Sequence, residues 1–169
     1  MTYHYTMCGL DYVYLRSGVR EHNTEYGAGV SIEHADDLDH VIAGRVLLEH
    51  ARLRGQEVRF LRSLTGLSQT EIANRLGVKR ASVARWEGAP NTPIPGPADR
   101  LLRLIAARLV YATEKTDILQ SLIDFLPEID NVKPEKMIMS YLPDEVDHAE
   151  PMFPDESADN DSDGWKIAL

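Results

Sequence analysis

Hydrophobic positions at helical spacing begin a series of helices in the middle of the chain. In the stretch QEVRFLRSLTG, Val58, Leu61 and Leu64 recur every three residues, and Gly66 is a typical stop. This pattern predicts a first helix that starts near Gln56 and packs one apolar stripe against a core.

Two shorter helices are predicted directly after it. Ser68 is the expected N-cap of the first of these, and Glu71 three residues later completes a capping box. The core-facing positions of this helix are Ile72, Ala73 and Leu76, and it ends at Gly77. The next helix runs from about Arg80 to Glu87. Two short helices with a glycine-bearing turn of three or four residues between them form a helix-turn-helix.

The second of the two helices separates its side chains by chemistry. Val83 and Trp86 lie three residues apart on one face and are expected in the core. The opposite face carries two arginines and two small residues, Arg80, Ala81, Ala84 and Arg85. An arginine can bond guanine O6 and N7 together, and an alanine methyl can contact a thymine methyl. The alternative is an ordinary helical hairpin with a solvated outer face.

Helices are also expected on both sides of this series. One runs from about Asp37 to Leu53 with Asp36 or Asp37 as its cap, and carries surface histidines. Another has Pro97 at its first position and ends near Ala112. A last one has Ile118, Leu122 and Phe125 at helical spacing, and packs on the core or forms a dimer contact. The surface histidines are His34, His40 and His50.

Short strands are predicted at the two ends of the chain. Tyrosines alternate with other residues in YHYTM and YVYL, as in a small sheet, and residues 136–142 and 164–169 form a C-terminal β-hairpin. The fold class is therefore mainly α with small β elements. Residues 1–54 form a small N-terminal β/α module, 55–113 the helix-turn-helix domain, and 114–142 with 164–169 the C-terminal helix and strands.

Charge is distributed unevenly along the chain, whose net charge is −9. Residues 1–50 hold three Lys or Arg against eight Asp or Glu, a net of −5. Residues 51–110 hold eleven against four, a net of +7, and residues 111–169 hold four against fifteen, a net of −11. A basic middle between acidic ends indicates a local anion-binding surface.

Residues 143–163 stand apart as an insertion between the two C-terminal strands. They contain nine acidic residues and no Lys or Arg, a composition that predicts disorder. The insertion serves either as a solubilising spacer or as a competitor of DNA for the basic surface.

Several function classes are excluded on sequence grounds. The chain has no secretory signal, no apolar run long enough to cross a bilayer, and a single cysteine, so we expect a soluble protein of the cytoplasm without a membrane partner. It contains no catalytic motif, so we expect neither an enzyme nor a cofactor; Gly27 and Gly29 in YGAGVS are expected in a turn. His4, Cys8 and His22 lack the usual ligand spacings, so no metal site is expected.

The stretch LTGLSQTEIANRLGVKRASVARWEG resembles the Cro/cI-type (XRE) helix-turn-helix of transcriptional regulators. The resemblance implies a five-helix domain that dimerises on palindromic double-stranded DNA. It also implies that Gln69 contacts a phosphate, that Lys79 lies near one, and that Arg62 and Glu87 form a buried salt bridge. The positions that contact bases in the family are Arg80, Ala81 and Arg85, with Ser82 at the margin.

The flanking segments resemble regulators and antitoxins of the MqsA type. The similar stretches are PGPADRLLRLI, YHYTMCGLDYVYLRSGV and GVSIEHADDLDHVIAGRVL. Members proper carry a four-cysteine zinc site at the front, whereas this chain has only Cys8, so it is similar to relatives without zinc. Two functions follow from the resemblance. One is a dimeric repressor of its own operon; the alternative is an antitoxin that sequesters a toxin protein through the N-terminal module.

Overall fold

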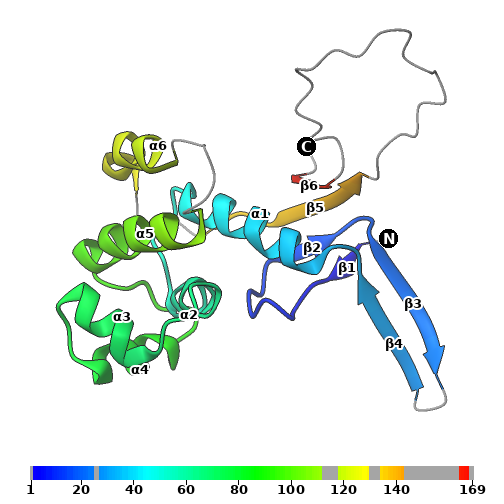
Figure 1. The fold of residues 1–169 in the computed structure, drawn as a ribbon, viewed down its shortest axis with the longest axis horizontal. Coiled ribbons are helices and arrows are strands. Elements are labelled where there is room, and N and C mark those ends of the chain that lie inside the picture. Colours follow the sequence, from blue (N-terminus) through cyan, green and yellow to red (C-terminus); the bar gives the residue numbers. More distant parts are fainter. Residues whose placement is uncertain (1, 25–26, 112–117, 130–133, 143–163, 168–169) are drawn as a thin grey trace, which may run out of the picture.

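Six α-helices and six β-strands make up the part of the chain that the structure describes (Figure 1). It is a computed structural model, and it describes residues 2–24, 27–111, 118–129, 134–142 and 164–167. The helices are α1 (Ala35–Leu47), α2 (Gly55–Leu64), α3 (Gln69–Leu76), α4 (Arg80–Glu87), α5 (Gly96–Val110) and α6 (Ile118–Phe125), the last followed by the 3-10 turn η1 (Leu126–Glu128). The strands are β1 (Tyr3–His4), β2 (Val13–Leu15), β3 (Val19–Thr24), β4 (Gly27–Ile32), β5 (Met137–Leu142) and β6 (Gly164–Ile167). The predicted class, mainly α with small β elements, is confirmed. The insertion predicted at 143–163 lies outside the described residues.

One sheet joins the two ends of the chain. Its strand order is β1-β2-β5-β6, and only the β2–β5 contact is parallel. The sequence predicts that β1 pairs with β2 and β5 with β6, and both pairs are present. It does not predict that Val13 lies opposite Met137, which makes the C-terminal hairpin part of the N-terminal sheet.

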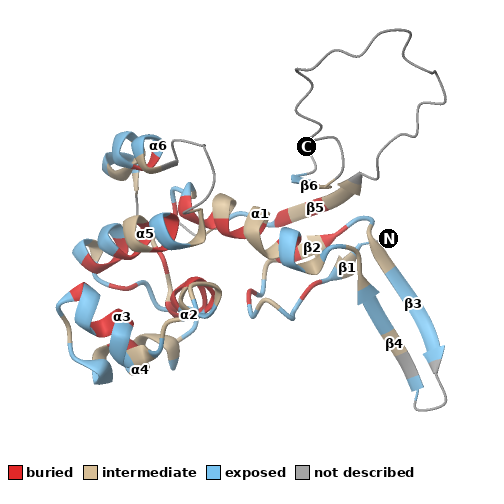
Figure 2. Cartoon of the chain, in the orientation of Figure 1, coloured by how far each residue is buried: buried red, intermediate tan, exposed pale blue. Residues whose placement is uncertain are grey.

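A second, two-stranded ribbon projects away from this sheet (Figure 1). Strands β3 and β4 pair antiparallel from Val19↔Ile32 to Thr24↔Gly27, and most of their described side chains are exposed (Figure 2). The turn expected at Gly27 and Gly29 was wrong, because both glycines lie within β4. The polar sequence of β3 shows no alternation from which a strand could be predicted.

Helix α1 differs from its prediction at both ends. It begins after His34, whose φ of 42° is left-handed, and it has no side-chain cap. The expected caps Asp36 and Asp37 lie instead in the first turn, where a negative charge complements the helix dipole. The helix ends at Leu47 rather than near Leu53, because the chain after it turns around a buried arginine of α5.

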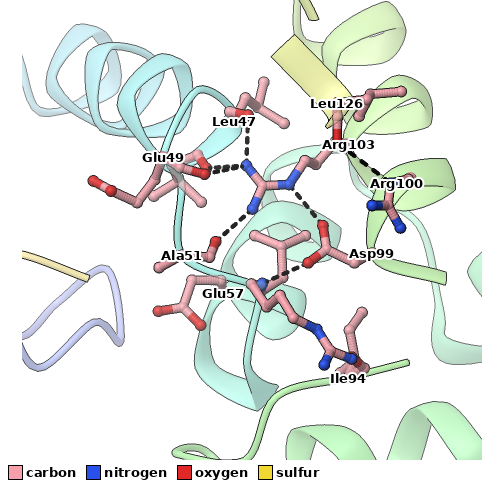
Figure 3. Close-up of polar contacts among 12 residues, drawn as sticks. Leu47, Glu49, Ala51, Glu57, Ile94, Asp99, Arg100, Arg103 and Leu126 are labelled. Carbon is pink, nitrogen blue, oxygen red and sulfur yellow. Dashed lines mark hydrogen bonds and ion pairs between the residues drawn. The ribbon is translucent and has the colours of Figure 1, made fainter. Parts of the chain in front are cut away.

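That arginine, Arg103, is fully buried and clamps the end of α1 to α5 (Figure 3). Its Nε donates to Asp99 Oδ1 over 2.7 Å. Its other nitrogens donate to the backbone carbonyls of Val46, Leu47, Glu49 and Ala51, over 3.1, 2.6, 2.9 and 2.7 Å. Asp99 Oδ2 accepts from the backbone N–H of Leu53 over 2.8 Å. The α1–α2 connection is therefore fixed from inside by one ion pair.

A single hydrophobic core runs through the helices and the four-stranded sheet. It includes Leu38 and Ile42 of α1, Leu61 of α2 and Leu102 of α5, all fully buried (Figure 2). Helix α5 begins one residue earlier than predicted, so that Pro97 is its second residue, and it ends at Val110. The described residues of 55–113 contain four helices, α2 to α5, and α6 packs on α5 with Leu122 buried.

Candidate functional site

The site is built on α3, α4 and the short turn between them. Ser68 caps α3: its Oγ accepts from Glu71 N over 3.2 Å, and Glu71 Oε2 accepts from Ser68 N over 2.8 Å. Gly77 ends the helix with a φ of 67°, a left-handed conformation that favours glycine. Both ends of α3 therefore lie where the sequence predicted them, and α4 begins three residues after Gly77.

Helix α4 buries one face and exposes the other. Val83 is fully buried, and Trp86 is half-buried against the same core. On the opposite face Arg80, Ala81 and Arg85 are exposed, whereas Ser82 and Ala84 are half-buried. Lys79, the N-cap residue, is exposed and makes no side-chain cap. The cations of Lys79, Arg80 and Arg85 have no ion pair or hydrogen bond with a described residue, so they are available to an anion in solution.

The carboxylate of Glu87 connects α4 to both preceding helices, α2 and α3. Glu87 at the end of α4 accepts from Arg62 of α2 through two parallel contacts, Nε–Oε1 of 2.6 Å and Nη2–Oε2 of 3.1 Å. Gln69 at the start of α3 donates its Nε2 to Glu87 Oε2 over 2.9 Å. The Glu87 side chain is 7% exposed and that of Arg62 18%. The pair implied by the resemblance is therefore present, and it fixes α4 relative to both preceding helices.

The environment of Glu87 favours its charged form. Burial acts to raise its pKa, but the hydrogen bonds from Arg62 and Gln69, with the charges of Arg62 and Arg59, outweigh burial and hold the pKa below its usual range. Glu87 therefore stays ionised at neutral pH and keeps Arg62 paired.

The link between Gln69 and Glu87 was not predicted. Gln69 was expected to contact a phosphate, and its side-chain amide carries two N–H donors. One N–H donates to Glu87, so only the second N–H remains for the expected phosphate contact.

Gly55 was also not predicted to matter. A Cβ at this position would collide with the backbone oxygens of Trp86 and Ala89, so glycine allows α2 to approach the end of α4 closely.

The basic character of residues 51–110 survives in the folded structure. Two of its eleven cations are internal, Arg62 paired with Glu87 and Arg103 with Asp99, and these charges cancel. Nine Lys or Arg then remain against two Glu, which leaves the net of +7 unchanged. Arg75, exposed in the last turn of α3, adds to the cations around α4 and was not among the predicted contacts.

The residues weighed as metal ligands each bond to a different neighbour. The His4 ring bonds to the carbonyl of Asp11 over 3.1 Å, and the His22 ring bonds to Ser31 Oγ over 2.7 Å. The Cys8 thiol donates to the carbonyl of Tyr5, and burial raises its pKa to about 11. Within the described ranges, no three His, Cys, Asp or Glu side chains form a cluster that could hold a metal ion.

None of the helices in the described part of the chain combines the length and apolar character that crossing a bilayer requires.

Comparisons of the chain with models of protein families, with curated proteins and with solved structures find no match. The function must therefore be inferred from the residues of the site and their geometry.

Proposed function

We propose that the chain is a sequence-specific DNA-binding regulator of transcription that acts as a homodimer and represses its own operon. The observation that carries the proposal is the exposed face of α4, where Lys79, Arg80 and Arg85 have no partner among the described residues and surround a small residue, Ala81. On this proposal α3 and α4 form the helix-turn-helix of a Cro/cI-like domain, of which the described residues of 55–113 hold the four helices α2 to α5. The role is non-enzymatic, needs no cofactor, and belongs to the cytoplasm.

Each side chain of this face has a proposed role. The major groove of B-DNA admits an α-helix, and α4 presents Arg80 and Arg85 for the acceptors of guanine. Ala81 allows close approach and can meet a thymine methyl, and Ser82, half-buried, lies at the margin. Lys79 and the second amide hydrogen of Gln69 bond to phosphates, which fix the position of the helix on the duplex.

Rigidity supports this assignment of roles. A helix that contacts base edges must be held in one orientation, and Glu87 ties the end of α4 to α2 and α3 at once. Arg62 also donates to the carbonyl of Leu67 over 3.0 Å, at the entry to α3. The guanidinium thus orders both helices before any DNA is bound, which lowers the entropic cost of binding.

A dimer follows from the small number of base pairs that one helix can contact. Two copies place their helices about 34 Å apart, one turn of B-DNA, on a palindromic operator. We place the dimer surface on α5 and α6, where apolar side chains remain exposed: Leu101 (38%) and Leu109 (37%) on α5, and Ile123 (53%) on α6. A second copy of the chain would cover them.

The test is selection of bound duplexes from a random double-stranded DNA library by the purified full chain. We expect an enriched inverted repeat whose half-sites are about one helical turn apart. The same repeat should then be protected by the protein in its own promoter. Recovery of random sequences would contradict sequence-specific binding, and an unprotected promoter would contradict autorepression.

A second function is favoured by the β3–β4 ribbon. An isolated two-stranded hairpin is only marginally stable in water, yet this one projects with exposed side chains such as Val30 (41%). In the antitoxin alternative, this ribbon of the N-terminal module binds and sequesters a toxin protein. Replacement of residues 20–31 by a short turn should abolish co-purification of the neighbouring gene's product and leave DNA binding intact. Co-purification that survives the replacement would exclude the ribbon as the binding element.

A further inference from the structure

A cavity of about 600 Å³ opens between the loop after β1, helices α1 and α2, and the end of α4. It lies where the N-terminal part of the chain meets the helical part, and no proposed DNA contact lines it. Pockets that bind small molecules usually measure about 300–1,000 Å³ and occur where two structural units meet. The volume of this cavity falls within the range of known small-molecule pockets.

Part of the wall is apolar. Met7 is 74% exposed at the rim, whereas Phe60 of α2 lines the cavity but is only 5% exposed. Methionine is flexible and polarizable, so it adapts to ligands of different shape. These two side chains offer a surface to an aromatic ring or a short aliphatic chain.

The charged side chains of the wall differ in how many hydrogen bonds they already make within the protein. The oxygens of Glu87 accept three hydrogen bonds from Arg62 and Gln69. Asp39 Oδ1 accepts from the Tyr5 hydroxyl over 3.2 Å, and the side chain can accept more. Arg59 is exposed and has no ion pair or hydrogen bond with a described residue. The cavity thus offers the Arg59 guanidinium, which acts on Glu87 through its charge but donates no hydrogen bond to a described residue, and the Asp39 carboxylate, which can accept further hydrogen bonds.

We propose that this cavity binds a small amphipathic molecule whose acidic group bonds to Arg59, whose apolar body lies against Met7 and Phe60, and whose N–H or O–H faces Asp39. A planar guanidinium binds carboxylate, sulfonate and phosphate groups alike, so the acidic group belongs to this class of oxyanions. The inference concerns a site apart from the α4 face, and its test requires no DNA.

A suitable probe is 8-anilinonaphthalene-1-sulfonate, which combines a sulfonate, aromatic rings and one N–H. Titration of the full chain should give saturable fluorescence with one molecule bound per chain. Arg59→Ala removes the guanidinium, and Ser63→Trp places an indole in the cavity from a position on α2 that lines it. Each substitution should weaken binding at least tenfold.

Matched controls distinguish this site from general binding to apolar surface. Arg108→Ala on α5 and Ser121→Trp on α6 make the same changes at exposed positions outside the cavity, and should leave the affinity unchanged. Circular dichroism melting curves establish that all four variants fold. Absence of saturable binding, or equal effects of the cavity and control substitutions, would overturn the proposal.

Discussion

Arg62 and Glu87 face each other through two parallel hydrogen bonds that join the end of α2 to the end of α4. Because the side chains are only 7% exposed for Glu87 and 18% for Arg62, water can compensate only in part when one partner is removed. A bidentate contact between a guanidinium and a carboxylate also has a fixed geometry, which a single point charge does not provide. The pair therefore determines how α4 sits on the rest of the molecule.

Loss of the carboxylate should destabilise the fold strongly. Glu87→Ala leaves the mostly buried Arg62 without its counter-charge and removes the acceptor of Gln69, at a cost of roughly 3–5 kcal/mol in the free energy of unfolding. Urea unfolding monitored by circular dichroism measures it. Arg20→Ala, which breaks an ion pair with Glu33 at a 72% exposed side chain, is the control and should cost less than about 1 kcal/mol. Equal effects of the two variants would contradict a structural role for Glu87.

Substitution within the buried Arg103–Asp99 pair of α5 should destabilise the fold at least as much as the loss of Glu87. Arg103→Leu leaves the Asp99 carboxylate buried and uncompensated, and it strips the donor from four backbone carbonyls at the end of α1. We expect a loss of at least about 3–5 kcal/mol, enough to unfold a chain of ordinary stability. The matched variant Arg100→Leu changes an exposed arginine of the same helix and should melt within a few degrees of the wild type. A folded Arg103→Leu with wild-type melting would show that the clamp is dispensable.

Glu57 should make the stability depend on pH in the opposite sense to Glu87. Its side chain is buried, Oε2 accepts from Arg54 N over 2.7 Å, and Oε1 has no hydrogen bond of good geometry with a described residue. Burial raises the pKa of Glu57 and outweighs the contributions of Arg54 and the nearby Tyr12 hydroxyl, which favour the charged form. A carboxyl group whose pKa is higher in the folded state stabilises the fold below its unfolded pKa, about 4.3, and this contribution is lost as the pH rises through the folded pKa.

Glu57→Gln removes the ionisation while keeping an oxygen for Arg54 N. The variant should therefore match the wild type near pH 4 and become progressively more stable than the wild type as the pH rises toward 8. Denaturant unfolding of both proteins across this range measures the difference, and all other titrating groups cancel in it. Stability curves that stay parallel over the whole range would mean that Glu57 ionises without cost.

The elements predicted best are those whose ends are fixed by neighbouring residues. Ser68, Glu71 and Gly77 bound α3 through local contacts, so both of its ends were predicted correctly. The spacing of Val83 and Trp86 likewise oriented α4, because the side-chain periodicity of a helix is a local property. The exposed cations of α4 were predicted for the same reason.

The elements predicted worst depend on partners that are distant along the chain. Arg103 stands in DRLLRLI, where an arginine three residues after another suggests a solvated face, and only the returning end of α1 makes it a core residue. The pairing of β2 with β5 joins residues more than one hundred positions apart, and nothing local indicates it. The end of α1 was missed for the same reason, because Arg103 donates hydrogen bonds to the last backbone carbonyls of that helix.

On our proposal α4 contacts the bases of an operator, and two variants, one in α4 and one at its N-cap, test this most directly. Arg85, assigned to a base edge, and Lys79, assigned to a phosphate, are both exposed and without a partner among the described residues. Affinity is measured by fluorescence anisotropy for the selected operator and for a scrambled duplex, at several salt concentrations. Arg85→Ala should cost about 1–3 kcal/mol on the operator and barely affect the scrambled duplex. Lys79→Ala should weaken both duplexes equally and reduce the slope of log K against log salt by about 0.9 for each phosphate that the lysine no longer neutralises. Equal losses on the two duplexes for Arg85→Ala would contradict base contact by α4, and wild-type affinity in both variants would contradict DNA binding by this face altogether.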